Sequence, residues 1–310
     1  MLDVRRLRVL REVAACGSFS GAADALSFTQ SAVSQQMAAL EREAGASLVE
    51  RGARGVRLTD AGRALVRHAD AVLARLDDAE QELAAIAGLR GGRLRLASFQ
   101  SAGAALVPDA VRAFSERYPD VELGLREAEP QESLVALKAG ECDLALVYAY
   151  PALRQEPDGD VDLVRLLEDK MHAALPRDHR LAARARVRME QLSGDAWISG
   201  DLACGRLLRH ACDAAGFDPR VRLETSDYAT MQGLVAAGVG VTLLPDLVLA
   251  TGTNPGVVVR PLAGEAPTRT IWAATPAGGY RSAAVEAMLG ILEEVCSGFE
   301  ERLAPAASVG

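Results

Sequence analysis

Residues 17–45, GSFSGAADALSFTQSAVSQQMAALEREAG, decide the fold of the N-terminal part of this 310-residue chain. Ser18 and Thr29 each precede an apolar run at helical spacing, and each hydroxyl can cap the helix that begins after it. Gly45 follows the second run, as glycine commonly does where a helix ends. The stretch therefore predicts two helices joined by a short turn, which is a helix-turn-helix. A further helix, capped by Asp3, is predicted to precede them.

The helix that follows Thr29 has two different faces. Val33, Met37 and Leu40 fall on one side and form its predicted buried stripe. Short hydroxyl and amide side chains gather on another face together with one arginine: Gln30, Ser31, Ser34, Gln35 and Arg42. Such side chains can approach base edges closely, so this face suits the reading of DNA in the major groove. The alternative is that these polar side chains only solvate an exposed helix.

A short hairpin follows this helix. Residues 48–51 and 56–58 favour strands, and the glycine-bearing turn between them contains Arg54. A hairpin that carries arginines directly after a helix-turn-helix is typical of a wing, which contacts phosphates or the minor groove. A surface hairpin without a role is the alternative.

Five sequence blocks in this region together resemble the N-terminal signature of the LysR-type transcriptional regulators. In order, they are GSFSGAA (17–23), TQSAVSQQM (29–37), LE (40–41), LVER (48–51) and LTDAG (58–62). Five blocks at matching spacing form a far more specific signal than any single motif. The resemblance implies a sequence-specific, DNA-binding transcriptional regulator whose promoter binding is modulated by a small-molecule effector.

The resemblance also implies roles for individual residues in DNA binding. Base contacts are implied for Gln30, Ser31 and Ser34. Phosphate contacts are implied for Ser20, Gln35 and Arg51. Arg54 is implied to make a contact from the wing.

Three positions depart from the family pattern. Ser31 stands where the family often has proline, Gln35 where it often has a basic residue, and Val49 where phenylalanine is usual. Loss of a basic residue should weaken the nonspecific attraction to phosphates. Loss of the phenylalanine shrinks a core contact, and neither change removes the fold.

Charge is distributed unevenly along the chain. The formal net charge is −8, yet residues 1–58 carry eight arginines against six acidic residues. This region therefore has a charge of +2, and the remainder totals −10. A mildly basic segment on an acidic body permits local phosphate contact, whereas the overall charge argues against a protein that coats nucleic acid by charge alone.

The composition is that of an ordinary folded protein, with 49% hydrophobic and 25% charged residues. No apolar run approaches the roughly 20 residues that a membrane helix needs. Arginines interrupt the first turns of the chain, so no secretory signal is recognisable there. Five cysteines without close metal-ligand spacing fit a reducing compartment. We therefore expect a cytoplasmic protein without membrane contact.

A long helical run starts at Thr59 and Asp60 and extends to about residue 87. Apolar residues recur in it at alternating steps of four and three: Leu65, Ala69, Val72, Leu76, Ala79, Leu83 and Ile86. This heptad seam predicts pairing with a second helix, although packing on its own domain is the alternative. The resemblance implies a linker helix that pairs two subunits antiparallel, in dimers and further in tetramers. Residues 89–92 are expected to form a flexible boundary.

From residue 93 onward, strand-like and helix-like runs alternate. Such alternation predicts an α/β domain with a mainly parallel sheet covered by helices. The resemblance implies a type II periplasmic-binding-protein-like fold, with ligand in the cleft between two subdomains. The expected organisation is a winged helix-turn-helix DNA-binding domain at 1–58, a linker and dimerisation helix with hinge at 59–90, and an effector-binding domain at 91–303. Subdomain I of the last comprises 91–165 and 267–303, and subdomain II comprises 166–266.

Candidate effector contacts lie where strands end and helices begin. Open α/β sheets bind ligands at these corners, where helix N-termini offer unpaired N–H groups. The corners on the two sides of the expected cleft carry six polar residues: Ser98, Gln100, Ser101, Ser199, Thr225 and Ser226. Each could be only a helix cap, but as a set on matching corners they indicate effector binding.

Nothing in the sequence assembles a catalytic site. The four histidines show no metal-binding helical spacing, and neither a phosphate-binding Gly-Lys-Ser/Thr loop nor a Gly-x-Ser-x-Gly elbow is present. We therefore expect no enzymatic activity, no metal and no cofactor, with an enzyme or a solute-binding protein as alternatives of another class. The expected partners are double-stranded promoter DNA, a small-molecule effector, further copies of the chain and RNA polymerase.

Cys204 and Cys212 provide an alternative mode of sensing. Peroxide-sensing members of the family carry a redox cysteine pair in this region, with a similar but not identical separation. Eight residues along one helix would hold the sulfurs roughly 12 Å apart, so a disulfide would require local unfolding. Cysteine is also commonly a plain core residue, and we favour a small metabolite as the signal.

Overall fold

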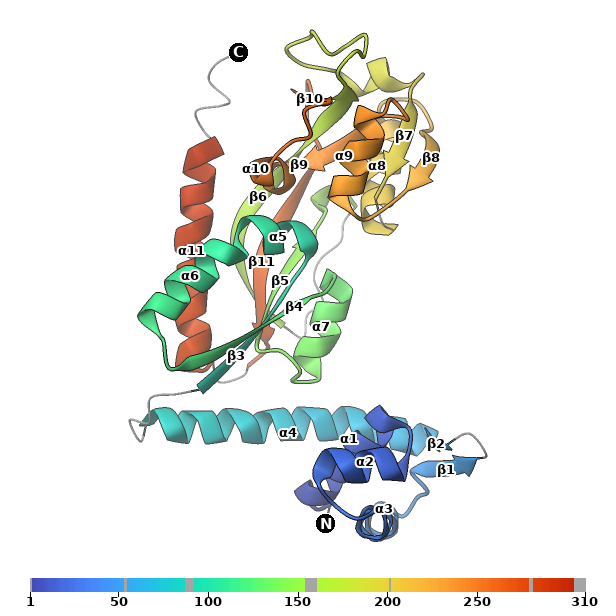
Figure 1. Ribbon diagram of the computed structural model, residues 1–310, viewed down its shortest axis with the longest axis vertical. Helices are drawn as coiled ribbons and strands as arrows, with labels where there is room; N and C mark the ends of the chain where they lie inside the picture. Colours follow the sequence, from blue (N-terminus) through green and yellow to red (C-terminus); the bar gives the residue numbers. More distant parts are fainter. Residues whose placement is uncertain are drawn as a thin grey trace. The chain divides into compact units, whose positions relative to one another are not determined.

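The computed structural model describes residues 2–52, 55–86, 92–153, 161–200, 202–278 and 281–303. The chain forms two compact units (Figure 1), a first unit of residues 1–92 with 135–142 and a second unit of residues 93–134 with 143–310. Within the described ranges, no helix has both the length and the apolar character needed to cross a bilayer.

Three helices build most of the first unit, and each begins after the residue that the sequence predicts as its cap. They are α1 (Val4–Cys16), α2 (Phe19–Leu26) and α3 (Gln30–Ala44). The side chains of Asp3, Ser18 and Thr29 each accept a hydrogen bond from a backbone N–H of the first turn. Gly17 and Gly45 end α1 and α3 with φ angles of 62° and 66°, a conformation that glycine adopts without strain. The predicted helix-turn-helix is confirmed.

A hairpin completes the wing. β1 (Val49–Gly52) pairs antiparallel with β2 (Gly55–Leu58), as the sequence predicts. Apolar side chains from all three helices, from the start of the hairpin and from the long helix that follows it form one buried core: Leu7, Val9, Leu10, Val13, Phe19, Ala22, Ala23, Val33, Met37, Leu40, Leu48, Val49 and Ala69. Val49 is buried in this core, so the smaller side chain still serves as a core residue where the family usually has phenylalanine.

The helix α4 (Asp60–Ile86) starts after Thr59, whose hydroxyl accepts a hydrogen bond from the backbone N–H of Gly62. Three apolar side chains of its first turns pack on the core of the first unit: Leu65, Val66 and Ala69. α4 also packs against α1. Large apolar side chains farther along are exposed: Val72, Leu76 and Leu83. The predicted seam is thus divided, since its first turns serve the helix's own unit. Residues 89–91 of the predicted boundary lie outside the described residues.

The second unit contains a large mixed sheet with the strand order β10-β6-β11-β5-β3-β4, and β9 also pairs with β6. The strands are β3 (Gly92–Ser98), β4 (Val121–Glu127), β5 (Leu144–Ala149), β6 (Val161–Pro176), β9 (Thr242–Pro245), β10 (Val257–Pro261) and β11 (Thr268–Pro276). A separate pair of parallel strands is formed by β7 (Ala196–Ser199) and β8 (Arg220–Glu224).

The expectation of a mainly parallel sheet is wrong for the centre of this unit. β3 and β5 are parallel, but β11 runs antiparallel to both β5 and β6, and β6 is antiparallel to β9 and β10. The reason is that β6 and β11 carry the chain in opposite directions between two packed regions of the unit. Helix and strand alternation along the sequence does not reveal such returning strands.

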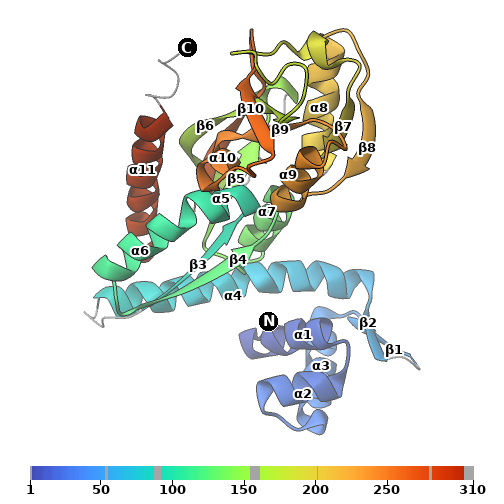
Figure 2. The ribbon, with the colours of Figure 1, turned by 45° about the horizontal axis from the view of Figure 1, so that its top comes forward.

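Two packed regions lie along β6 and β11 (Figures 1 and 2). Subdomain I contains β3, β4 and β5 with α5 (Gln100–Ala105), α6 (Val107–Arg117) and α11 (Ala283–Leu303), and α11 packs beside α6. α7 (Pro130–Lys138) begins in the second unit, whereas its residues 135–138 belong to the first. Subdomain II contains β7 to β10 with α8 (Leu202–Ala214), α9 (Tyr228–Ala236) and α10 (Asp246–Thr251). Short 3-10 helices lie at Pro151–Leu153 and Met189–Leu192. β6 takes part in the cores of both subdomains, with Leu167 and Met171 in the core of subdomain I and Ala173 and Leu175 in that of subdomain II. α8 and α10 also contribute side chains to both cores.

Candidate effector cavity and nucleic-acid interface

The polar face predicted for α3 lies on the surface of the first unit. Gln30, Ser31 and Gln35 are exposed and Ser34 is half-buried, whereas Val33, Met37 and Leu40 on the other side are buried. Ser20 of α2 is exposed as well. Arg51 lies in β1, and Arg54 lies outside the described residues. The structure thus places four of the predicted contacts on α3 and a fifth on the neighbouring helix.

Two residues that the sequence interpretation did not use hold α3 in place. The guanidinium of Arg6 donates to the side-chain oxygen of Gln36 at 3.2 Å and forms an ion pair with Glu43. The carboxylate of Glu41 accepts the backbone N–H groups of Leu48 and Val49 at 2.8 and 3.3 Å. Arg6 therefore joins α1 to α3, and Glu41 fixes the start of the wing against α3. The family motif contains this glutamate, but its role requires the tertiary contact.

A cavity of about 50 Å³ lies between the two subdomains of the second unit. Four of the six predicted effector contacts line it: Gln100, Ser101, Ser199 and Ser226. The other two serve local structure. Ser98 donates its hydroxyl to the carbonyl oxygen of Phe99, and Thr225 accepts the backbone N–H of Asp227. The structure therefore brings four residues of the set together around one cavity, and their contact with an effector stays a prediction.

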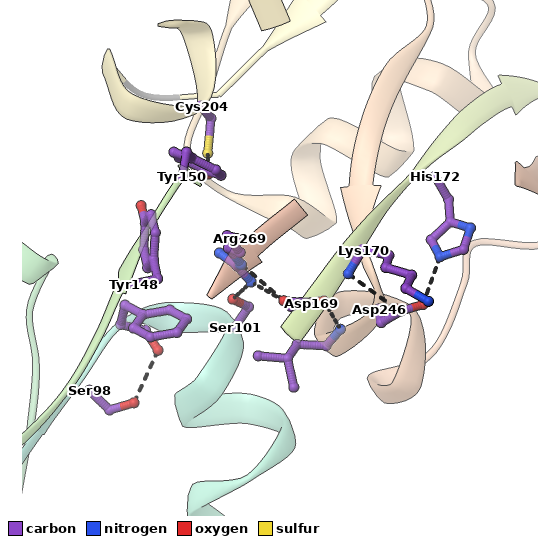
Figure 3. A network of polar contacts seen from close by, with 12 residues as sticks. Ser98, Ser101, Tyr148, Tyr150, Asp169, Lys170, His172, Cys204, Asp246 and Arg269 are labelled. Atoms are coloured by element: carbon purple, nitrogen blue, oxygen red, sulfur yellow. Dashed lines mark hydrogen bonds and ion pairs between the residues drawn. The ribbon is translucent and has the colours of Figure 1, made fainter. Parts of the chain in front are cut away.

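Arg269 is the charged residue around which one wall of the cavity is built (Figure 3). It lies on β11 directly opposite Asp169 of β6. Its Nε and Nη2 donate to Oδ2 of Asp169 at 2.9 and 2.7 Å, and Nη2 also donates to the hydroxyl of Ser101 at 2.7 Å. Oδ1 of Asp169 accepts the backbone N–H of Leu247 in α10 at 3.2 Å. The pair therefore joins both strands to a helix of each subdomain.

Aromatic rings complete the surroundings of this guanidinium. The Cζ atom of Arg269 lies 5.1 Å from the ring centroid of Phe99 and 4.8 Å from that of Tyr148, which is cation–π geometry. Tyr148 stacks edge-on against both Phe99 and Tyr150, with ring centroids 4.7 and 5.4 Å apart. The rings exclude water from the ion pair and fix the plane of the guanidinium.

Burial governs the electrostatics of this pair. Arg269 and Asp169 are 1% and 0% exposed. Burial alone would lower the pKa of Arg269, but the carboxylate of Asp169, together with smaller contributions from Tyr228, Tyr150 and Cys204, outweighs burial and holds that pKa above its ordinary value. Burial raises the pKa of Asp169, against the opposing effect of the guanidinium. Because arginine remains protonated in proteins, the two side chains persist as a buried ion pair.

Two contacts cross the cavity from one subdomain to the other. The hydroxyl of Tyr150 lies 3.2 Å from the Sγ atom of Cys204 in α8, and the amide of Gln100 donates to Oδ2 of Asp227 at 3.4 Å. Burial raises the pKa of Tyr150 well above its usual range, so its hydroxyl stays neutral and can donate. These contacts hold the subdomains together around the cavity.

Cys204 and Cys212 lie on the same helix, α8, as the sequence predicts. Cys204 lines the cavity, whereas Cys212 is fully buried in the core of subdomain II. Burial raises the pKa of the Cys212 thiol to about 12. Cys212 is therefore a neutral thiol near pH 7 and a poor nucleophile.

Two histidines in the second unit, His172 and His179, lie beside carboxylates. Nε2 of His172 lies 2.7 Å from Oδ1 of Asp246, and Nε2 of His179 lies 3.2 Å from Oδ1 of Asp195. Within the part of the chain that the structure describes, no group of three or more histidine, cysteine, aspartate or glutamate side chains is arranged to hold a metal ion.

The sequence interpretation missed Arg269, Tyr148 and Tyr150. One signal was available, because Arg269 is the only charged residue in β11, TRTIWAATP, whose central residues are buried. A charged residue in such a strand must be paired or functional. The partner, Asp169, is 100 residues away in sequence and could not be identified without the strand register.

Comparisons with known proteins agree with this architecture. A family model described as LysR substrate binding domain matches residues 87–297, and one described as bacterial regulatory helix-turn-helix protein, lysR family, matches residues 4–63. The transcriptional dual regulator GltC of Bacillus subtilis is 32% identical over 274 residues, which cover 87% of this chain and 89% of GltC.

A second relative and a solved structure extend over nearly the whole chain. The hydrogen peroxide-inducible genes activator of Pectobacterium carotovorum is 30% identical over 307 residues, 97% of this chain and 99% of that protein. A full-length OxyR variant from Pseudomonas aeruginosa has a TM-score of 0.75 at 24% identity, covering 94% of this chain and 95% of that one. At this identity, the structural likeness establishes the fold alone.

Proposed function

The chain belongs to the LysR family of bacterial transcriptional regulators, and we propose that its winged helix-turn-helix binds promoter DNA sequence-specifically while a small-molecule effector in the cavity modulates that binding. The observation that carries the effector part of this proposal is the cavity, which residues of both subdomains line. A ligand there contacts both subdomains, so it can favour one arrangement of them over another.

We assign functions to segments of the chain as follows. Residues 1–58 bind DNA, residues 59–90 form the linker helix and hinge, and residues 91–303 bind the effector. In the last domain, subdomain I takes 91–165 and 267–303, and subdomain II takes 166–266. The separate buried clusters of the two subdomains, with β6 contributing to both, support this division.

We further propose that the cavity binds its effector without converting it. No histidine is among the described residues that line it, so the serine hydroxyls there have no imidazole base beside them. A regulator that binds promoter DNA acts where the chromosome is, and on this ground we place the protein in the cytoplasm, where RNA polymerase is its further partner.

Gln30→Ala is expected to remove one base preference from the operator. The exposed amide of Gln30 can pair bidentately with adenine, and loss of such a pair costs about 1–3 kcal/mol at that base position. Selection of binding sites from random DNA measures this preference directly. Arg54→Ala, in the wing, should instead weaken binding to all sequences and reduce its salt dependence.

Gln131→Ala provides the matched control, because it removes an exposed glutamine from the start of α7, which belongs to the second unit. Its consensus should equal that of the unmodified protein. If Gln30→Ala returned the same consensus as well, α3 would not be the reading helix.

We propose that α4 pairs two chains, and that pairs of dimers form tetramers. Its exposed side chains Val72, Leu76 and Leu83 are spaced as a continuing seam, and such a face is stable in water when a second helix covers it. Leu76→Glu should raise the dimer dissociation constant at least tenfold, because it places two carboxylates in the seam. Light scattering across a concentration series measures this change.

Ala71→Glu introduces the same charge at an exposed position of α4 outside the seam. It should leave the dissociation constant unchanged. A monomer at micromolar concentration, or equal behaviour of the two variants, would exclude pairing through α4.

Thiol-based sensing through Cys204 and Cys212 is the second candidate, favoured by the 30% identity to a hydrogen peroxide-inducible genes activator. Two properties of this chain favour a small effector instead. The raised pKa of Cys212 disfavours the thiolate that disulfide formation requires. Both cysteines also lie on one continuous helix, which would have to unfold for the sulfurs to meet.

A further inference from the structure

Arg269 has one nitrogen, Nη1, that donates no hydrogen bond to the described residues. Nε and Nη2 donate to Asp169 and Ser101, but in the described part of the chain Nη1 donates to no acceptor. The side chain is 1% exposed, and it lines the cavity between the subdomains. The two N–H groups of Nη1 can therefore reach a partner only inside that cavity.

Ser199 adds a second unsatisfied group to the same cavity. Ser199 is 2% exposed, and its Oγ atom has no hydrogen-bond partner among the described residues. Ser199 belongs to subdomain II, whereas the guanidinium of Arg269 is held against Ser101 of subdomain I. Unsatisfied buried polar atoms are rare in proteins, and each carries a desolvation cost that a ligand can remove.

Most other polar side chains that line the cavity already have partners. The hydroxyl of Tyr148 donates to Glu129 at 3.0 Å, and that of Thr242 donates to the carbonyl oxygen of Ile198 at 2.8 Å. The hydroxyl of Tyr150 is engaged with Cys204. A ligand in the cavity can therefore supply an acceptor for Nη1 of Arg269 and form a further hydrogen bond with the hydroxyl of Ser199.

The size and remaining walls of the cavity limit what can supply that acceptor. A volume of about 50 Å³ holds roughly three to five water-sized groups. Apolar side chains form much of the remaining wall: Met171, Ile198, Leu207 and Met231. A ligand that fits is a compact molecule with one polar end and a short apolar remainder. A cation lacking an acceptor is disfavoured, because it would meet the guanidinium of Arg269.

We propose that Arg269 recognises the effector through Nη1, and that the effector is a compact molecule of about three to five non-hydrogen atoms with a carbonyl or carboxylate oxygen. This oxygen accepts from Nη1, and the hydroxyl of Ser199 bonds the same polar end. Asp169 and Ser101 position the guanidinium by occupying its other nitrogens. The inference rests on the proposed effector function and names the chemistry of that site.

Thermal unfolding of the full-length protein with three small probes tests this assignment. Acetate and acetamide share a size and a carbonyl oxygen but differ in charge, and ethylammonium carries no acceptor. Acetate or acetamide should raise the melting temperature in a saturable manner, and whichever binds more tightly identifies a carboxylate or a neutral carbonyl. Ethylammonium should have no effect. Failure of both oxygen probes, or an equal shift with ethylammonium, would overturn the proposal.

Two variants connect the binding to the named atoms. Arg269→Lys keeps a positive charge opposite Asp169 but removes Nη1, and it should raise the probe's Kd by about tenfold to a hundredfold. Ser199→Ala leaves the ion pair intact and should raise it by about fivefold. An unchanged Kd in Ser199→Ala excludes that hydroxyl even if Arg269→Lys fails to fold, and an unchanged Kd in a folded Arg269→Lys overturns the assignment.

Failure of this inference is distinguishable from failure of the proposed function. If the probes do not bind but the unmodified protein still selects a defined operator, the regulator assignment stands and the effector chemistry is wrong. Benzoate, with nine non-hydrogen atoms, checks the size limit. Stabilisation by benzoate equal to that by acetate would contradict a compact ligand.

Discussion

Asp169→Ala is expected to lower the free energy of unfolding of the second unit by about 3–5 kcal/mol. The carboxylate of Asp169 is the only carboxylate that the structure places within hydrogen-bond distance of Arg269, among the residues it describes. Its removal leaves a guanidinium that is 1% exposed without a counter-charge and also frees the backbone N–H of Leu247. Both tryptophans of the chain, Trp197 and Trp272, belong to the second unit, so denaturation followed by tryptophan fluorescence reports on this unit alone.

Asp162 supplies the matched control on the same strand. Its carboxylate faces Arg281 at 3.7 Å, but its side chain is 44% exposed, and exposed pairs typically contribute about 0–1 kcal/mol. Asp162→Ala should therefore cost far less than Asp169→Ala. If the two substitutions lowered the free energy of unfolding equally, the buried ion pair would contribute no more to the stability of the second unit than an exposed pair does.

The double substitution Asp169→Leu with Arg269→Met separates two causes of the loss. Buried ion pairs can often be replaced by apolar residues of similar volume at little cost, because desolvation offsets much of their attraction. We therefore expect the double variant to be more stable than Asp169→Ala while losing the response to oxygen probes. That combination would show that evolution retains the pair for recognition more than for stability.

The first unit could be predicted almost completely because its determinants are local. Asp3, Ser18 and Thr29 act within one helical turn of their own positions, and Gly17 and Gly45 act where the chain itself must reverse. The arrangement of the second unit depends instead on contacts between distant segments. The antiparallel pairing of β11 with β6 follows from the return of the chain between subdomains, which periodicity within a segment cannot show.

The same distinction explains the candidate site. Gln100 and Ser101 could be identified because they follow a strand end directly. The N-cap residue of α5 is Phe99, which makes no side-chain hydrogen bond. The hydroxyl of Ser101, in the first turn of this helix, accepts a hydrogen bond from Arg269. Ser98 and Thr225 have the same residue types at similar corners, yet they bond their own backbone. Which hydroxyl faces the cavity is therefore decided by packing.

The exposed part of α4 shows a third limit. The sequence predicts one continuous seam, but Ala69 at its start is buried in the core of the first unit, whereas Leu83 is 66% exposed. An apolar stripe in a sequence does not reveal which surface packs against it. Only the position of the compact core assigns the early turns to the chain's own unit and leaves Val72, Leu76 and Leu83 exposed.

Gly62→Ala is expected to disrupt the first unit although it adds a single methyl group. A Cβ at this position would overlap the carbonyl oxygen of Leu48 and lie 3.0 Å from its carbonyl carbon. Both are backbone atoms, so no side-chain rotation relieves the contact. The same carbonyl accepts the backbone N–H of Thr59, and Thr59 in turn accepts the N–H of Gly62. The start of α4 and the wing must therefore separate, at a cost of about 3 kcal/mol or more.

This separation should be visible without reference to the second unit. Hydrogen exchange of peptides from α1 to α3 should accelerate in Gly62→Ala, and DNA affinity should fall by on the order of a hundredfold, the equivalent of about 3 kcal/mol. Tryptophan fluorescence should remain unchanged, since both tryptophans lie in the second unit. Ala61→Ser, at the exposed neighbouring residue, should alter stability by less than about 0.5 kcal/mol. Unmodified DNA affinity in Gly62→Ala would mean that the close approach of α4 to Leu48 is not required for the wing to bind DNA.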